Sequence, residues 1–124
     1  MAFQWSEYLD LAQFLHKNGN KLDQVTQESA YRSAVSRAYY AVFCYAREYA
    51  CIKYGFKPST LPDVHKEIEI QFRKMDLYRI ANNLRDLRKW RNQCDYDNQV
   101  NDINSMVQKA IMRAREVFSE LIYS

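Results

Sequence analysis

The residues best suited to chemistry are Arg91 and Asp95, which stand four positions apart in a segment with helical periodicity. With about 100° of rotation per residue, Arg91 falls on the apolar face of that segment and Asp95 lies about 40° from it. The apolar residues of this face are Ile80, Leu84, Leu87 and Cys94. An inward guanidinium without a partner loses several kcal/mol of hydration free energy. Two interpretations stay open: an Arg91–Asp95 ion pair that joins two helices, or an anion-binding Arg91 oriented by Asp95 beside a groove.

Further cations stand near Arg91 in the sequence, at Arg85, Arg88 and Lys89, and Trp90 lies among them. Cations interleaved with an aromatic ring suit the phosphates and bases of nucleic acid. The same run is also typical of a solvated helix face, with Trp90 packed into the core. The net charge of +3 is compatible with both interpretations and does not decide between them.

The sequence shows no pattern typical of other catalytic sites or of metal sites. It has no Ser-His-Asp arrangement, glycine-rich phosphate loop or paired-carboxylate site, and His65 has no orienting partner beside it. The three cysteines are odd in number and form no Cys-x-x-Cys pair, so neither a disulfide framework nor a zinc site is indicated. We therefore predict no metal and no cofactor. We also expect a cytoplasmic protein without membrane contact, because the first ten residues hold acids and no basic region and no apolar run reaches spanning length.

The elements that must position these residues are helices. In 124 residues the chain has two Gly and two Pro, too few breakers for a sandwich or barrel, and its length suits one domain over residues 1–124. Periodicity predicts helices over about 3–17, 26–54, 76–94 and 98–123, and a shorter one that carries Val64, Ile68, Phe72 and Met75. Short connections favour antiparallel neighbours. The predicted fold is all-α, an up-and-down bundle of four or five helices.

Capping residues and breakers mark the predicted helix ends. Thr26 is the expected N-cap of the second helix, and Gly55 is positioned to end it. A loop over residues 57–62 follows, and Pro62 suits the first turn of the third helix. The second helix carries small residues at helical spacing that allow close approach of a neighbour, namely Ala34, Ala38 and Ala41.

Three stretches form a pattern: SAVSRAYYAVF at 33–43, VHKEI at 64–68 followed by Phe72, and LRKWRNQCDY at 87–96. The first resembles the long-helix signature of the small stand-alone HEPN proteins. The second resembles the next segment of that family, where a His precedes an apolar residue and a Phe. The third is similar to the family's Arg-x-x-Ala-Asp-Tyr segment, with Cys94 in the small position. Together with the helix order, these stretches cover nearly the whole chain.

The resemblance implies a helical bundle that is commonly a homodimer, in which the fourth-helix motifs meet across a groove. It also implies a minimal nucleotidyltransferase as partner, in modules of toxin–antitoxin type. Nuclease members of the superfamily cleave RNA without metal through a motif of Arg, four to six residues and His. In this chain no His follows His65, and Tyr96 stands at the first position where the motif's His is expected after Arg91. This departure leaves enzymatic activity open.

Residues and resemblance together support a leading hypothesis, a dimeric HEPN binding module. Arg91, Asp95 and Tyr96 would line an inter-subunit groove that receives an RNA or nucleotide phosphate or a nucleotidyltransferase. The residues assigned to nucleic-acid or nucleotide binding are Arg37, Arg85, Arg88 and Arg91. A first alternative is a metal-independent endoribonuclease with Arg91, Asp95 and Tyr96 as catalytic residues, or with His65 in place of Tyr96. A second alternative is a purely structural partner protein without a ligand.

Overall fold

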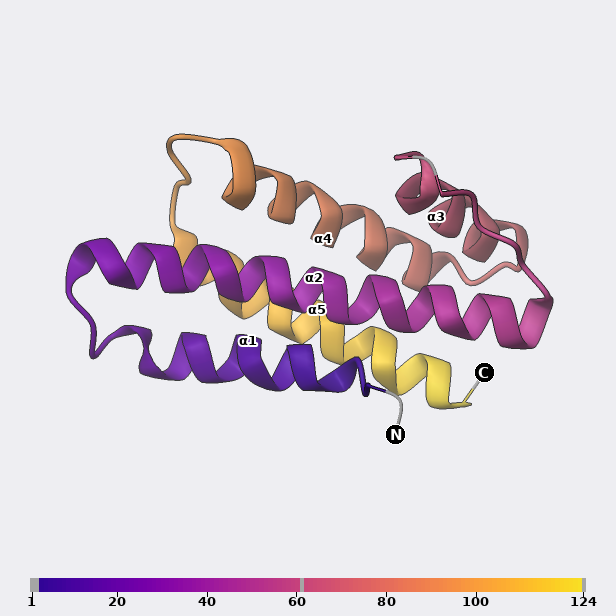
Figure 1. The fold of residues 1–124 in the computed structure, drawn as a ribbon, viewed down its shortest axis with the longest axis horizontal. Coiled ribbons are helices and arrows are strands. Elements are labelled where there is room, and N and C mark those ends of the chain that lie inside the picture. The colour runs from indigo at the N-terminus through magenta and orange to yellow at the C-terminus, as the bar shows by residue number, and fades with distance from the viewer. Residues whose placement is uncertain (1–2, 61, 124) are drawn as a thin grey trace.

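Five helices make up most of the part of the chain that the computed structural model describes, residues 3–60 and 62–123, and no strand occurs there (Figure 1). In chain order they are α1 (Ser6–Gly19), α2 (Gln24–Tyr54), α3 (Val64–Lys74), α4 (Tyr78–Tyr96) and α5 (Ile103–Tyr123). The prediction of an all-α fold is confirmed. Leu61, within the predicted loop 57–62, lies outside the described residues.

Helix α2 is the central element and runs the length of the bundle (Figure 1). It packs against each of the other four helices. Ala34, Ala38 and Ala41 are fully buried, and their small side chains let the neighbouring helices approach closely. Although α2 has 31 residues, neither it nor another helix of the described residues is long and apolar enough to cross a membrane.

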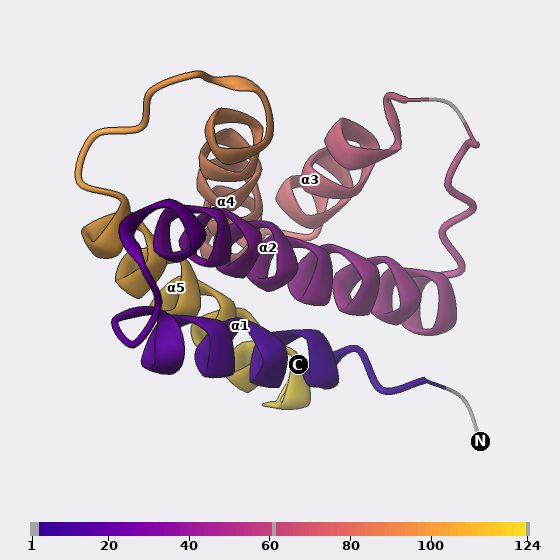
Figure 2. The ribbon, with the colours of Figure 1, turned by 60° about the vertical axis from the view of Figure 1, so that its left-hand side comes forward.

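Helix α3 is short and lies beside α4 at the end of the bundle where α2 terminates (Figures 1 and 2). It packs against both α2 and α4. The side chains of Ile68 and Phe72 on its apolar face are fully buried. This packing places the first turn of α3, which carries His65, next to the middle of the bundle.

The start of α2 differs from the prediction. The helix begins at Gln24, because Asp23 is its N-cap and its Oδ1 accepts a hydrogen bond from the Thr26 backbone N–H at 2.9 Å. The assignment of Thr26 as N-cap was therefore wrong, although Thr26 takes part in the cap. At the other end Gly55 has φ 66°, the left-handed conformation that glycine adopts readily, and the predicted stop is confirmed.

The starts of the third and fifth helices differ from the prediction too, and both lie later in the chain than predicted. α3 starts at Val64, so Pro62 lies in the turn before the helix. α5 starts at Ile103 rather than near 98, and Asp102 just before it has φ 50°. A positive φ is incompatible with a right-handed helix, so residues 97–102 form a connection that lets the chain reverse between α4 and α5.

Candidate functional site

Arg91 lies on the buried face of α4, as its position in the sequence predicted. Its side chain is 9% exposed, and its guanidinium carbon lies 5.3 Å from the ring centroids of both Tyr39 and Tyr40 of α2. The electron-rich faces of these rings attract the cation and replace part of its lost hydration. Arg91 therefore joins α4 to α2.

The hydrogen-bonding capacity of Arg91 is only partly used. Its Nη1 lies 3.6 Å from Asp95 Oδ2, which makes an ion pair longer than the roughly 2.7–2.9 Å of a charge-assisted hydrogen bond. Its Nε is buried and has no acceptor among the described residues. A buried N–H without a partner is unfavourable by about 1–3 kcal/mol. The ion-pair interpretation is thus supported only in part, because a donor remains that the protein does not satisfy.

The structure adds His65 to this site. His65 stacks on Phe43 with 4.2 Å between ring centroids, and its Nδ1 lies 2.5 Å from the hydroxyl oxygen of Tyr39. Burial raises the pKa of Tyr39 well above its usual value, so the hydroxyl stays protonated. His65 Nδ1 is the one hydrogen-bond partner that this buried hydroxyl has among the described residues, so we assign the hydroxyl as the donor and the proton of the neutral imidazole to Nε2. His65 consequently offers a hydrogen-bond donor rather than a free base.

The positive charges of three arginines act on His65, and we call Arg47, Arg88, Arg91 and His65 the arginine cluster. Burial, followed by the positive charges of Arg88, Arg91 and Arg47, lowers the pKa of His65 to about 4, so the imidazole is neutral at pH 7. Neither Arg47 nor Arg88 forms an ion pair within residues 3–60 and 62–123. A surplus of positive charge beside a neutral donor suits an anion.

Arg47 was not among the predicted site residues, although its position in the sequence relates it to Tyr40. Arg47 is seven residues beyond Tyr40 and therefore shares its helical face, and its Cζ lies 5.6 Å from the ring centroid of Phe43. What periodicity does not show is that α3 and α4 meet α2 beside this face. No comparable grouping exists for a metal: among the described residues, no three His, Cys, Asp or Glu side chains are placed to hold one.

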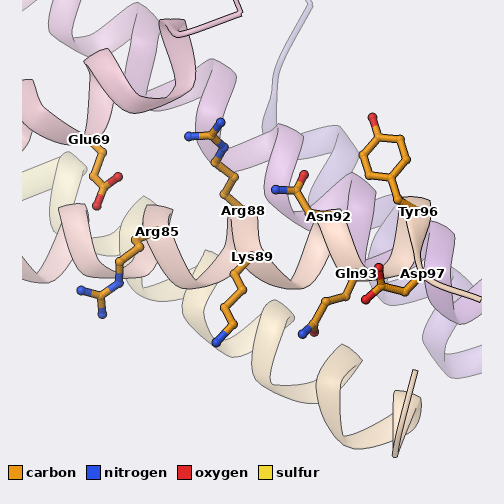
Figure 3. Close-up of a pocket in the computed structure, with 8 residues that line it drawn as sticks. All are labelled: Glu69, Arg85, Arg88, Lys89, Asn92, Gln93, Tyr96 and Asp97. Carbon is orange, nitrogen blue, oxygen red and sulfur yellow. The ribbon is translucent and has the colours of Figure 1, made fainter. Parts of the chain in front are cut away.

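Tyr96 lies apart from the arginine cluster. Figure 3 shows two rows of side chains along the outer face of α4, one formed by Arg88, Asn92 and Tyr96 and the other by Arg85, Lys89 and Gln93. Tyr96 is 74% exposed and stands five residues, about 140°, around the helix from the buried Arg91. Arg85 on this face is paired with Asp86 at 3.1 Å. Arg88 is the predicted residue that borders both this face and the cluster.

A groove of about 800 Å³ lies on the other side of α4, between α1, α2 and the end of α4. Arg37 and Asp95 line it, and the guanidinium carbon of Arg37 lies 5.0 Å from the ring centroid of Tyr8 and 5.7 Å from that of Tyr40. The predicted residues therefore divide into two surfaces. Arg37 and Asp95 face this groove, whereas Arg85 and Tyr96 lie on the outer face of α4.

Arg32 holds the end of α4 in place. Its Nη1 donates to the backbone carbonyls of Cys94 at 2.9 Å and Asp97 at 2.7 Å, and its Nη2 donates to that of Asn98 at 3.2 Å. Carbonyls at a helix C-terminus lack partners within the helix, so an arginine from α2 satisfies them. This contact fixes the turn on which Asp95 stands.

Trp90 belongs to the packing of α4 against α5. It is partly buried against the core, and the guanidinium carbon of Arg113 lies 5.6 Å from its ring. Arg113 also donates to Asn83 Oδ1 at 2.8 Å and to Asp86 Oδ2 at 3.0 Å. Trp90 therefore packs against the core, as the core interpretation predicted.

Comparison with known proteins agrees with the motif resemblance. The family model described as HEPN domain matches residues 7–122, nearly the whole chain. An uncharacterized protein of Methanocaldococcus jannaschii is 34% identical over 87 residues, a match that covers 56% of this chain and 49% of that protein. The chain thus spans about half the length of this curated relative. No solved structure matches the chain.

Replacing Arg91 by Met, which keeps an apolar stem without the charge, tests whether Arg91 is needed for stability. We expect the free energy of unfolding in urea to rise or to fall by less than about 1 kcal/mol, because apolar side chains often replace buried ions without loss. Asp95, at 31% side-chain exposure, can be hydrated without its partner. A loss of about 3 kcal/mol or more would instead identify Arg91 as a structural ion.

The low pKa of His65 makes stability depend on pH. The unfolded chain binds a proton on His65 near pH 6.5, whereas the folded chain does so only near pH 4. The free energy of unfolding should therefore fall as the pH is lowered from about 6.5 towards 4, with no contribution from His65 above that window. Denaturation at a series of pH values measures this slope. His65→Asn should flatten it; an unchanged slope in this variant would contradict the assignment.

Proposed function

The chain belongs to the HEPN domain family, and on this premise we propose that it binds a phosphate group of RNA or of a nucleotide at the arginine cluster. The observation that carries the proposal is the buried Nε–H of Arg91, which has no acceptor in the described structure. Buried donors in proteins are nearly always paired. An unpaired donor beside further cations therefore points to an acceptor that a ligand brings, and phosphate oxygens are charged, strong acceptors.

The other members of the cluster supply charge and a further donor. Arg47 and Arg88 have no carboxylate to release before they meet an anion. The imidazole of His65 adds its Nε2–H. Because the site is partly shielded from water, each of these contacts is stronger than it would be on an open surface. These features support a phosphate monoester or diester as the ligand class.

RNA cleavage is a second candidate function, and the position of His65 favours it. Both His65 and Arg91 contact Tyr39, whereas Tyr96 lies on a different face of α4. In an endoribonuclease His65 would then replace Tyr96 as the group that transfers the proton. As a base, however, His65 would have to give up its hydrogen bond with Tyr39 at Nδ1. The present tautomer therefore supports binding more strongly than base catalysis.

We also infer a two-fold homodimer that brings the two Arg91-to-Tyr96 segments together. The family resemblance implies it, and the polar end of α4 suits an interface that stays partly hydrated. A symmetric interface repeats each residue, so it doubles the positive charge near a bound phosphate. A minimal nucleotidyltransferase in a toxin–antitoxin module is the protein partner implied by the resemblance. Co-purification with the products of neighbouring genes tests that partner.

Salt titration of RNA binding tests the phosphate contacts. Affinity should fall as salt rises, because each neutralised phosphate releases condensed counterion. Arg88→Ala should weaken binding and reduce the slope of log affinity against log salt by about 0.7 for a single strand. Arg115→Ala, which removes an exposed arginine of α5, is the matched control and should change neither value. Binding that is insensitive to salt would contradict the proposal.

Incubation of purified protein with a varied RNA pool in chelator separates the two candidate functions. We expect binding without cleavage, because His65 Nδ1 is occupied by Tyr39. Cleavage that is lost in His65→Asn and kept in Tyr96→Phe would establish the endoribonuclease with His65 in the proton-transfer role. Gel electrophoresis of the labelled pool measures the outcome.

Light scattering at micromolar concentration tests the homodimer. The expected mass is twice that of the 14.9 kDa chain, and phosphate should shift the equilibrium further towards the dimer by bridging the two clusters. A strict monomer with and without phosphate would rule out the inference. So would a dimer structure in which the two Arg91 side chains lie on opposite outer faces.

A further inference from the structure

Guanidinium groups and aromatic rings alternate in a row that crosses three helices and ends with two adjacent rings. The row runs from Arg91 of α4 through Tyr40 and Arg37 of α2 to Tyr8 of α1 and to Trp5 just before α1. Successive distances between guanidinium carbon and ring centroid, or between ring centroids, are 5.3, 5.7, 5.0 and 5.8 Å. We call these five residues the cation–ring row. It begins inside the arginine cluster, because Arg91 belongs to both.

The cation–ring row lines a groove rather than the core. Its four members beyond Arg91 are partly exposed and face the 800 Å³ groove between α1, α2 and the end of α4. Trp5 is held in position, because its Nε1 donates to Glu48 Oε2 at 3.0 Å. The α2 wall of the groove also carries hydroxyl groups, those of Ser29, Ser33 and Ser36. At about 1.5 Å per residue, this wall extends about 22 Å from Ser29 to Cys44.

The charged residues that line the groove are two arginines, Arg32 and Arg37, and one carboxylate, Asp95, so the net charge is positive and suits an anion. Arg37 contacts the rings of Tyr8 and Tyr40 and forms no ion pair among the described residues. A cation over the face of a ring at a partly exposed site is held weakly, so it can still bind an anion. Two guanidinium groups, those of Arg37 and Arg91, lie over the ring of Tyr40. Tyr8 and Trp5 are partly exposed towards the groove. The packing of α1 against α2 does not by itself require an arginine such as Arg37 that has no acidic partner among the described residues.

We propose that this groove binds a single-stranded nucleic acid, with bases stacked on Tyr8 and Trp5 and a phosphate beside Arg37. A single strand offers phosphates and unstacked bases in alternation, which the cation–ring row matches. A duplex keeps its bases paired inside and does not offer their faces to the rings. The proposal rests on the proposed function, because Arg91 places the arginine cluster at one end of the groove.

Two strands with the same phosphates but different bases test the proposal. One is a decamer of non-self-complementary RNA, and the other is a decamer in which tetrahydrofuran spacers replace all the bases. We expect fluorescence anisotropy of labelled strands to show the RNA binding about fivefold or more tighter than the spacer strand, because each stacked base contributes to affinity. In a Trp90→Phe background Trp5 is the sole tryptophan, and unlabelled RNA should quench its emission while the spacer strand should not.

Substitutions in the row give a second, independent measurement. Tyr8→Leu should weaken RNA binding about fivefold or more and leave the spacer strand unaffected, because it removes a stacking surface and no charge. Tyr78→Leu, at an exposed tyrosine of α4 outside the groove, should leave both affinities unchanged. Thermal unfolding of each variant confirms that it is folded, and the quenching of Trp5 needs no substitution within the row.

The results test nucleic-acid binding in the groove separately from phosphate binding at the arginine cluster. Equal affinity for the two strands with unchanged Trp5 emission would overturn the groove and leave phosphate binding at the cluster in place. Failure of both strands to bind would overturn both proposals.

Discussion

Burial of Arg91 against the rings of Tyr39 and Tyr40 is the interaction on which the rest of the site depends. A guanidinium in this position needs compensation for its lost hydration, and Asp95 at 3.6 Å supplies only part of it. The two ring faces supply more, which requires α4 to lie close to α2. The alanine face of α2, with Ala38 fully buried, makes this approach sterically possible. The close packing of α4 on the alanine face of α2 thus determines where the positive charge of Arg91 lies.

The two tyrosines divide the surroundings of Arg91 into two sides. They are adjacent in α2 and therefore point about 100° apart. Tyr39 forms a hydrogen bond with His65 and therefore contacts α3. Tyr40 instead contacts the guanidinium of Arg37 and faces the groove next to α1. Arg91 touches both rings, so the arginine cluster and the groove share one cation. A ligand that spans the two sides would meet continuous positive charge.

The helices could be predicted from sequence more reliably than their ends. Periodicity placed all five, because one face of each helix is apolar. The caps depend on which side chain meets the first free N–H groups, and Asp23 and Thr26 are both suited to that role. The start of α5 depends on a backbone reversal at Asp102 that leaves no mark in the apolar pattern. Single contacts determine where a helix begins or ends, whereas many residues together determine that the helix forms.

The sequence by itself determined the all-α class, through its periodicity and its few Gly and Pro residues, and the inward position of Arg91, through rotation along one helix. It did not separate Tyr96 from Arg91: the prediction placed both in one groove, whereas Tyr96 lies on the outer face of α4. Only the tertiary structure decided that His65 and Arg91 both contact Tyr39 and that Arg37 lies between Tyr8 and Tyr40. It also decided that Arg47 and His65 both contact Phe43. His65 and Tyr39 are 26 positions apart and come from different helices. Periodicity describes which face of a helix is buried, but it does not say which residues of another helix cover that face. The site exists where three such faces meet, and that meeting is a property of packing alone.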